Sequence, residues 1–200
     1  MTETFFARPM EPDDLDSLGS WLLDMDDLAL FDRSLTVTPS RNALRRMWES
    51  ELAGDRSSTA CWFTVVTNER SPTAIGGFSS VKYAHGDATL AMFVSKPARG
   101  KGLGFHFGSL LLDIAFDHLR LRRLTTFFRS DNERTDRLVT HLGFREEGRM
   151  REAWFAKGRA FDAVVVGVLR DEWYANRSAL RAEIGCDQMI KFGAVEEHVP

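Results

Sequence analysis

The segment from Phe93 to Gly104 constrains this chain most, because an apolar, strand-like stretch passes through a glycine-rich basic turn directly into an apolar helix. Glycines let a backbone approach an anion closely, and the N–H groups of a first helical turn have no acceptor within the helix. Arg99 and Lys101 add positive charge to the turn. The segment therefore predicts a phosphate-binding loop at a helix N-terminus.

The spacing of the glycines separates three kinds of phosphate loop. A P-loop requires Ser or Thr after Gly-Lys, but Gly102 follows Lys101, and a dinucleotide fingerprint requires a third glycine where Phe105 stands. The remaining pattern is Arg-x-x-Gly-x-Gly, formed by Arg99, Gly102 and Gly104. This pattern resembles the pyrophosphate loop of the GNAT acyltransferases, which bind acetyl-coenzyme A. Taken alone, a structural turn would account for the same residues, so the rest of the chain decides.

Composition limits the classes of partner. The chain has 26 basic and 29 acidic side chains among 200 residues, so it lacks the positive field that duplex nucleic acid requires. Cys61 and Cys186 show no metal-ligand spacing, which predicts neither a metal site nor a disulfide framework. The N-terminus shows no signal pattern, and no apolar run approaches the roughly 18 residues of a membrane span. We therefore expect a cytoplasmic protein without nucleic-acid or membrane partners.

Periodicity and turn residues predict an α/β protein in the order β-α-α-β-β-β-α-β-α-β-β. About seven strands in a twisted mixed sheet and about four flanking helices are expected in one domain, residues 1–173. The acidic segment 24–32 is expected as a loop between the first two helices. The fourth helix is expected to begin at Asp131 and to end before Gly143. Residues 174–200 are expected as a C-terminal extension, with a short helix over 178–184.

This element order resembles the complete GNAT domain over roughly residues 5–173, with the glycine loop between the fourth strand and the third helix. Three stretches, 131–135, 141–149 and 164–173, resemble the branch that includes the Rim-type ribosomal-protein N-terminal acetyltransferases and the polyamine and amino-sugar acetyltransferases. The resemblance implies an N-acetyltransferase that moves an acetyl group from acetyl-coenzyme A to a primary amine of a small molecule or a protein N-terminus. It is also compatible with a homodimer.

The resemblance also implies which residues hold the donor. The strand residues Phe93, Val94 and Ser95 would bind the pantetheine arm through their backbone, and an N–H near Phe93 or Val94 would polarise the thioester carbonyl. Asn132 and Thr135 would face the arm from the opposite wall. The pyrophosphate would be held by Arg99, Gly100, Lys101, Gly102, Leu103 and Gly104.

The catalytic groups are less clearly indicated. Many relatives carry a tyrosine in the fourth helix as proton donor to the thiolate, but here Thr135 is the local alternative. Many also carry a glutamate near the start of the fourth strand, where this chain has Thr89. Asp87, Glu133 or the acids of segment 24–32 acting through water are then the candidate bases. Each of these acids also fits a solvated surface group, and Thr135 also fits a role in fixing the helical turn.

The acceptor side is interpreted from the acids of segment 24–32. By the resemblance this connection borders the acceptor slot, so Asp26 and Asp27 would attract a cationic amine, unless they only balance nearby arginines. Phe31 and Trp154 would line the slot, unless they belong to the core. The missing tyrosine and glutamate keep a second function open, a catalytically weak acyl-coenzyme A sensor or interaction module. A nucleotide-phosphate binder is a third interpretation of the same loop.

Overall fold

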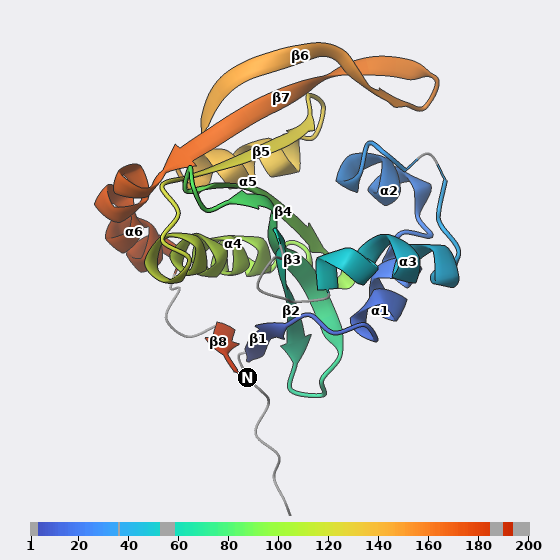
Figure 1. Cartoon of the computed structure of the whole chain (residues 1–200), viewed down its shortest axis with the longest axis horizontal. Coiled ribbons are helices and arrows are strands. Elements are labelled where there is room, and N and C mark those ends of the chain that lie inside the picture. The colour runs from blue at the N-terminus through green and yellow to red at the C-terminus, as the bar shows by residue number, and fades with distance from the viewer. Residues whose placement is uncertain (1–3, 36, 53–58, 185–189, 194–200) are drawn as a thin grey trace, which may run out of the picture.

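A computed structural model describes residues 4–35, 37–52, 59–184 and 190–193 of the chain. These residues form one mixed sheet of eight strands in the order β6-β7-β5-β4-β3-β2-β1-β8, with helices on both faces (Figure 1). The strands are β1 Phe5–Pro9, β2 Cys61–Thr67, β3 Pro72–Lys82, β4 Asp87–Val94, β5 Arg123–Arg129, β6 Arg145–Ala156, β7 Arg159–Leu169 and β8 Ile190–Phe192. The helices are α1 Asp14–Trp21, α2 Met25–Phe31, α3 Arg41–Leu52, α4 Leu103–Asp113, α5 Glu133–His141 and α6 Arg170–Ile184. The predicted mixed α/β fold is confirmed.

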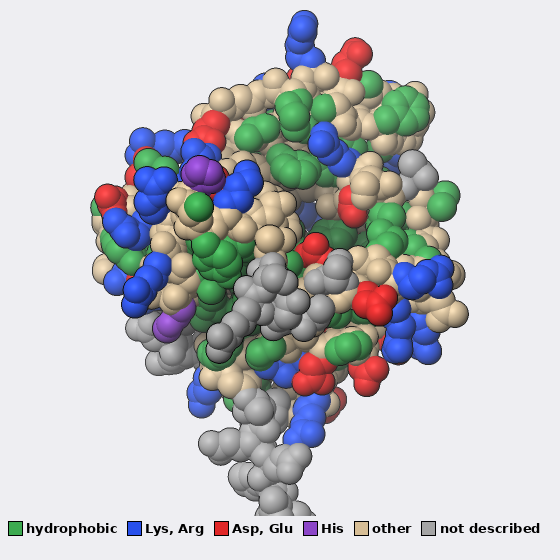
Figure 2. All heavy atoms as spheres, in the orientation of Figure 1, with side chains coloured by type: hydrophobic (Ala, Val, Ile, Leu, Met, Phe, Trp, Pro, Cys, Tyr) green, Lys and Arg blue, Asp and Glu red, His purple; other side chains and the backbone are tan. Residues whose placement is uncertain are grey.

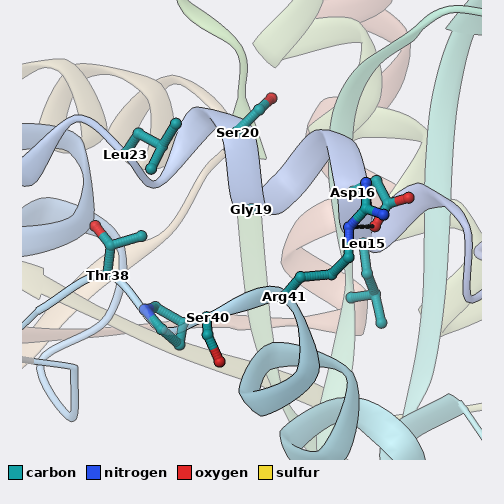
Figure 3. A pocket seen from close by; sticks show the side chains of 9 residues that line it. Leu15, Asp16, Gly19, Ser20, Leu23, Thr38, Ser40 and Arg41 are labelled. Carbon is teal, nitrogen blue, oxygen red and sulfur yellow. Dashed lines mark ion pairs between the residues drawn. The ribbon is translucent and has the colours of Figure 1, made fainter.

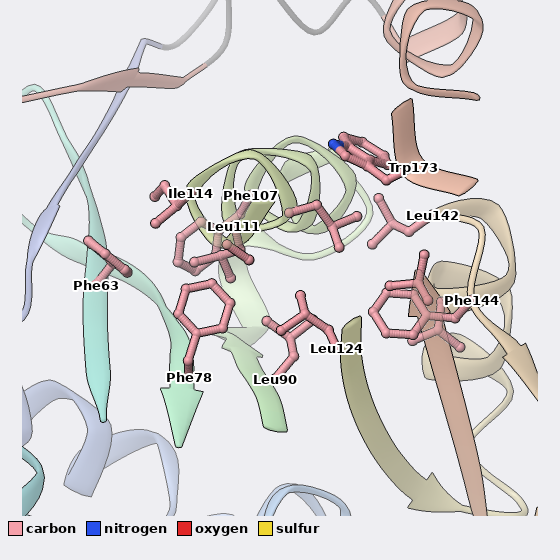
Figure 4. Close-up of a cluster of buried hydrophobic side chains, with 14 of the residues drawn as sticks. Phe63, Phe78, Leu90, Phe107, Leu111, Ile114, Leu124, Leu142, Phe144 and Trp173 are labelled. Carbon is pink, nitrogen blue, oxygen red and sulfur yellow. The ribbon is translucent and has the colours of Figure 1, made fainter. Parts of the chain in front are cut away.

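The larger hydrophobic core lies between one face of the sheet and the helices α4, α5 and α6 (Figure 4). Phe107 and Leu111 of α4 are fully buried there against Phe78 of β3 and Leu90 of β4. A π-helical turn, Ile114–His118, follows α4 directly. The apolar residues after the glycine loop thus form the helix that the sequence predicts, and burying this helix fixes the position of its N-terminus.

A second hydrophobic cluster covers the other face of the sheet. It joins the leucines of α1 to Leu28 of α2, Leu44 of α3, and Ile75 and Phe93 of the sheet. Phe93 therefore points away from α4, toward α2, whereas Met92 and Val94 on either side of it pack against the larger core. The sheet separates a face that carries α4 from a face that carries α2.

Strands β4 and β5 pair over only part of their length. They are parallel neighbours, with Asp87 opposite Arg123 and Thr89 opposite Thr125 as the ends of the paired stretch. Beyond this point β4 continues beside β3 to Val94, and β5 continues beside β7 to Arg129. Within the described residues, the two strands therefore separate and leave a gap whose closed end is the Thr89–Thr125 pair.

Segment 24–32 differs from the prediction, because it contains the helix α2 rather than only a loop. The Asp24 carboxylate caps this helix and accepts hydrogen bonds from the N–H groups of Asp26 and Asp27 at 3.0 and 3.1 Å. Carboxylates are favourable at a helix N-terminus, where the backbone carries partial positive charge. The acids that suggest a solvated loop therefore start a helix, and Leu28 anchors it in the second cluster.

The chain after β7 differs from the prediction in two elements. The expected short helix 178–184 is the end of a longer helix, α6, which begins at Arg170. Helix α6 runs without interruption through residue 173, and the buried Trp173 donates a hydrogen bond from Nε1 to Asp113 of α4 at 3.0 Å. Strand β8 pairs in parallel with β1, Phe5 lying opposite Ile190. The described residues thus contain eight strands and six α-helices instead of about seven and about four. None of these helices combines the length and hydropathy that a membrane span requires.

The start of α5 also differs in detail. Asn132, not Asp131, is its N-cap, and the Asn132 side chain accepts a hydrogen bond from the N–H of Thr135 at 3.3 Å. Asp131 instead pairs with Arg129 at 2.6 Å. The C-terminal end agrees with the prediction, because Gly143 follows the helix with a φ of +88°, a left-handed conformation that favours glycine.

Candidate active site

The loop between β4 and α4 has the geometry of an anion site. Gly102 is the N-cap of α4 with a φ of +81°, and its carbonyl accepts from the N–H of Phe105 at 2.9 Å. The N–H groups of Leu103 and Gly104 belong to the first turn, where a helix supplies no acceptor. A Cβ added to Gly104 would meet no atom closer than 3.7 Å, so packing does not require glycine there. The absent side chain instead leaves the helix N-terminus open to a ligand.

The edge of β4 presents selected backbone groups to the gap. The N–H of Ser95 donates to the carbonyl of Thr73 at 2.9 Å. Since N–H groups alternate sides along an antiparallel strand, those of Phe93 and Ser95 face β3, whereas those of Met92 and Val94 face the gap. Of the three strand residues that the sequence suggests, Val94 is therefore the one placed to bind a ligand. Met92 was missed, and only the register of β4 could have identified it.

The Arg99 side chain is held by α2. Its two terminal nitrogens donate to the two carboxylate oxygens of Asp27 at 2.9 and 3.0 Å, and its Nε donates to the Val94 carbonyl at 2.8 Å. Its guanidinium also lies 5.3 Å from the centre of the Phe93 ring. Arg99 thus connects the loop before α4 to the helix on the opposite face of the sheet.

The other acids of α2 are paired as well. Asp24 forms a hydrogen-bonded ion pair with Lys96, which holds the pKa of the Asp24 carboxyl below its usual range. Asp26 pairs with Lys157, in the turn between β6 and β7, at 2.8 Å. Lys96 lies on the β4 side of the gap and Lys157 on the β7 side. Helix α2 is therefore attached to both sides.

The aromatic candidates of the acceptor side lie around α2. Phe31 meets Phe93 edge to face at 5.2 Å. Trp154 of β6 is 2% exposed and donates from Nε1 to the Ala29 carbonyl at 2.9 Å. Arg129 of β5 donates to the same carbonyl at 3.1 Å. The structure brings Asp26, Asp27, Phe31 and Trp154 together around one helix, as the acceptor-side interpretation requires.

The candidate catalytic residues lie in three different places. Thr135 is half-buried in the first turn of α5. Glu133 precedes it in the same turn, but its side chain is 83% exposed and pairs with Arg137 at 3.3 Å. Asp87 lies on the face that carries α2, two residues before Thr89, which marks the closed end of the gap. Its nearest cation is Lys82 at 3.9 Å. Asp87 is the least tightly paired of the carboxylates at this end.

A row of residues that the sequence does not reveal crosses four strands at the closed end of the gap. Arg123 of β5 donates to the Thr125 hydroxyl at 3.0 Å and to Glu147 of β6 at 2.6 Å. Both charged groups lie over Gly167 of β7, where an added Cβ would come within 2.5 Å of Glu147. The register of three strands produces this row, with Thr89 of β4 at its end.

A cavity of about 280 Å³ lies away from the gap, between α1 and the segment that leads into α3 (Figure 3). Leu15, Gly19 and Leu23 form one side of it, and an ion pair between Asp16 and Arg41 at 2.9 Å lies at its margin. Its lining, as far as the structure describes it, includes none of the residues predicted for the donor or the acceptor. In the same described ranges, no group of three His, Cys, Asp or Glu side chains is arranged to hold a metal ion.

Comparison with known proteins agrees with this geometry. The family model described as an acetyltransferase (GNAT) domain matches residues 5–145. The chain therefore belongs to the GNAT acetyltransferase family, and the prediction of an acyltransferase is confirmed at this level.

Individual relatives cover most of the chain. The "SPbeta prophage-derived uncharacterized N-acetyltransferase YokL" of Bacillus subtilis is 27% identical over 179 residues, which are 87% of this chain and 94% of the relative. The spermidine N(1)-acetyltransferase of Vibrio cholerae is 26% identical over 116 residues, 58% of this chain and 66% of the relative. A crystal structure of spermidine N-acetyltransferase from Vibrio cholerae in complex with CoA and spermine has a TM-score of 0.77 at 19% identity, covering 86% of this chain and 98% of that one. At that identity the likeness shows the fold.

Proposed function

We propose that this chain transfers an acetyl group from acetyl-coenzyme A to a primary amine by direct attack in a ternary complex. The observation that carries the proposal is the gap between β4 and β5 beside the N-terminus of α4. The unpaired edge of β4 can bind the amides of the pantetheine arm, and the first turn of α4 can bind the pyrophosphate. Motifs 131–135 and 141–149 support a place near the Rim-type branch of the family.

In the proposed reaction, the amine nitrogen forms a bond to the thioester carbonyl carbon and the carbon–sulfur bond breaks. The amine must be neutral to attack, although an alkylammonium has a pKa of about 10.4 and an α-ammonium one of about 7.7–8.0. The amine loses one proton and the leaving thiolate gains one. Solvent then takes the proton from the base and returns one to the donor, so the enzyme ends unchanged. We assign donation to the thiolate to the Thr135 hydroxyl.

We assign removal of the amine proton to Asp87, acting through water. Glu147 also lies at the closed end of the gap, but Arg123 donates a hydrogen bond to it at 2.6 Å, so one of its carboxylate oxygens is already occupied. Glu133 points to solvent beside Arg137. Asp87, 3.9 Å from Lys82, has the most distant cation of these three carboxylates.

A covalent acyl-enzyme is not part of the proposal. The thiol of Cys61, on β2, is partly buried, and burial raises its pKa. A thiol with a raised pKa remains protonated and is a poor nucleophile near neutral pH. Cys186 lies outside the described residues.

The test combines calorimetric titration with coenzyme A and a thiol-release assay with acetyl-coenzyme A and a panel of amines. Gly104→Asp should abolish binding, because it places a carboxylate against the pyrophosphate, and Gly104→Asn is the control of equal size without the charge. Unchanged affinity of the Asp variant would contradict the donor site, and a smaller loss in the Asn variant would measure the part due to crowding. Binding without thiol release from any amine would favour the acyl-coenzyme A sensor. Light scattering of the same samples tests the proposed homodimer.

A further inference from the structure

The position of α2 bears on which amines the site accepts, an inference that rests on the proposed function. Direct attack requires the amine nitrogen to reach the carbonyl carbon of the thioester inside the gap. The proposed donor lies beside the N-terminus of α4, which packs on one face of the sheet. The amine must then approach from the opposite face, where α2 and the aromatic rings around it lie.

The three carboxylates at the start of α2, which border this approach, each form an ion pair with a basic side chain of the chain. Asp24 pairs with Lys96, Asp26 with Lys157, and Asp27 with Arg99 through two hydrogen bonds. The pairs attach α2 to both sides of the gap, so a ligand that took one of these carboxylates would have to replace a bond that positions the helix. Attraction of a cation by these acids is therefore largely cancelled.

The carboxylates at the closed end of the gap are paired too. Glu147 binds Arg123, and Asp87 lies near Lys82. Asp131, beside the open end of β5, is bound by Arg129 through two nitrogens at 2.6 and 3.2 Å. An incoming ammonium group would meet no carboxylate without a partner among these residues.

The remaining surface of this side carries aromatic rings and the exposed guanidinium of Arg33. Phe127 of β5 is 37% exposed and faces α2, and its ring lies 6.3 Å from that of Trp154. The Arg33 guanidinium lies 5.2 Å from the centre of the Phe127 ring, and no described carboxylate pairs with it. Figure 2 shows hydrophobic side chains over the region of β6 and β7 at the top of the view and a hollow below them near the centre.

We infer that the acceptor is an amine with a single positive charge on an aromatic or apolar body, and that polyamines are disfavoured. The reacting ammonium loses its charge before attack, but a second ammonium would keep its charge beside Arg33. It would also find Asp24, Asp26 and Asp27 already paired with cations. The aromatic rings around α2 offer contact area to an apolar body instead. The inference separates this chain from the spermidine N-acetyltransferases whose fold it shares.

The test compares kcat/KM for two amines of equal length, hexylamine and 1,6-diaminohexane, with phenylethylamine and spermidine as further probes. The kcat/KM for hexylamine should exceed that for the diamine by about tenfold, because an uncompensated second charge in a partly exposed site weakens binding by at least that factor. The kcat/KM for phenylethylamine should likewise exceed that for spermidine. A preference for the diamine or for spermidine would overturn the inference. Thiol release from none of the amines would instead contradict the proposed function and, with it, this inference.

A variant tests directly whether the ion pairs of α2 determine the preference between the two amines. Lys157→Ala removes the partner of Asp26 and should raise kcat/KM for the diamine several-fold while leaving that for hexylamine unchanged. Lys191→Ala, on β8 at the other end of the sheet, makes the same change in net charge and should alter neither. An equal effect of Lys157→Ala on both amines, or equal effects of the two variants on the diamine, would contradict the role of the paired acids.

Discussion

The donor side and the acceptor side of the gap are held in different ways. The donor side consists of β4, the following loop and α4, and its proposed ligand-binding groups are backbone N–H groups positioned by the sheet and the larger core. The acceptor side depends on α2, a helix of seven residues attached through side chains to β5, β6, the β6–β7 turn and the loop before α4. Substitutions should therefore affect the two sides differently.

Asp27→Asn should give the largest effect, because it leaves Arg99 without its carboxylate in a mostly buried pair. Breaking such a pair costs about 3 kcal/mol. Hydrogen exchange of the α2 amides should report this loss as easier local opening. Asp26→Asn is the control, since the exposed pair with Lys157 should contribute less than about 1 kcal/mol. Equal effects of the two variants would show that the Asp27–Arg99 pair does not hold α2.

Acid should weaken the acceptor side through α1. Asp14 is buried, and burial alone would raise its pKa, but hydrogen bonds from Arg8, the N–H of Glu11 and the Thr64 hydroxyl lower the pKa on balance. Its contribution to stability is therefore present above the unfolded value of about 3.9 and is lost as the pH falls through the lower folded value. Urea unfolding between about pH 6 and pH 2 should show this loss. Asp14→Asn should be less stable at neutral pH and less dependent on pH, and an unchanged slope would contradict the assignment.

Trp154→Phe should have a smaller effect that is confined to the acceptor side. The variant keeps an aromatic ring but removes the hydrogen bond to the Ala29 carbonyl, which costs about 1 kcal/mol. The KM for the amine should rise, whereas calorimetry should find unchanged affinity for coenzyme A. Loss of coenzyme A affinity would mean that the two sides are coupled through α2.

Gly104→Ala should separate stability from function on the donor side. A Cβ there makes only ordinary contacts, and alanine in a helix is favoured over glycine by about 0.5–1 kcal/mol. Urea unfolding should therefore show a slightly more stable protein, while affinity for coenzyme A falls because the methyl group crowds the first turn of α4. Unchanged affinity would place the pyrophosphate elsewhere.

The same difference explains what could be predicted from the sequence. The β4–α4 unit depends on local features, namely the glycines, the basic turn and an apolar helix, and these lie within 12 consecutive residues, Phe93 to Gly104. The acceptor side depends on partners far apart in the chain, such as Asp27 and Arg99, which are 72 residues apart. Charge alone indicated that the acids of segment 24–32 needed cations, but only the fold decides which cations reach them.

Two further features, the first half of α6 and the row of side chains over Gly167, were missed for physical reasons of the same kind. Helix α6 has few buried residues, among them Trp173 and Leu180, so its apolar pattern is weak in the sequence. The row over Gly167 depends on the register of three strands, and a glycine within a strand does not reveal which side chains lie above it. Long-range placement, rather than local preference, determines both.

The Ala29 carbonyl has a consequence for how acceptor preference could change during evolution. It is one of the last carbonyls of α2, which no N–H of the helix can satisfy, and it receives both Trp154 and Arg129. Because this acceptor belongs to the main chain, replacing the side chain at position 29 does not remove it. The residues around it on α2 can therefore vary while the helix keeps its attachment to β5 and β6. New amine preferences could arise by point substitution without rebuilding the fold.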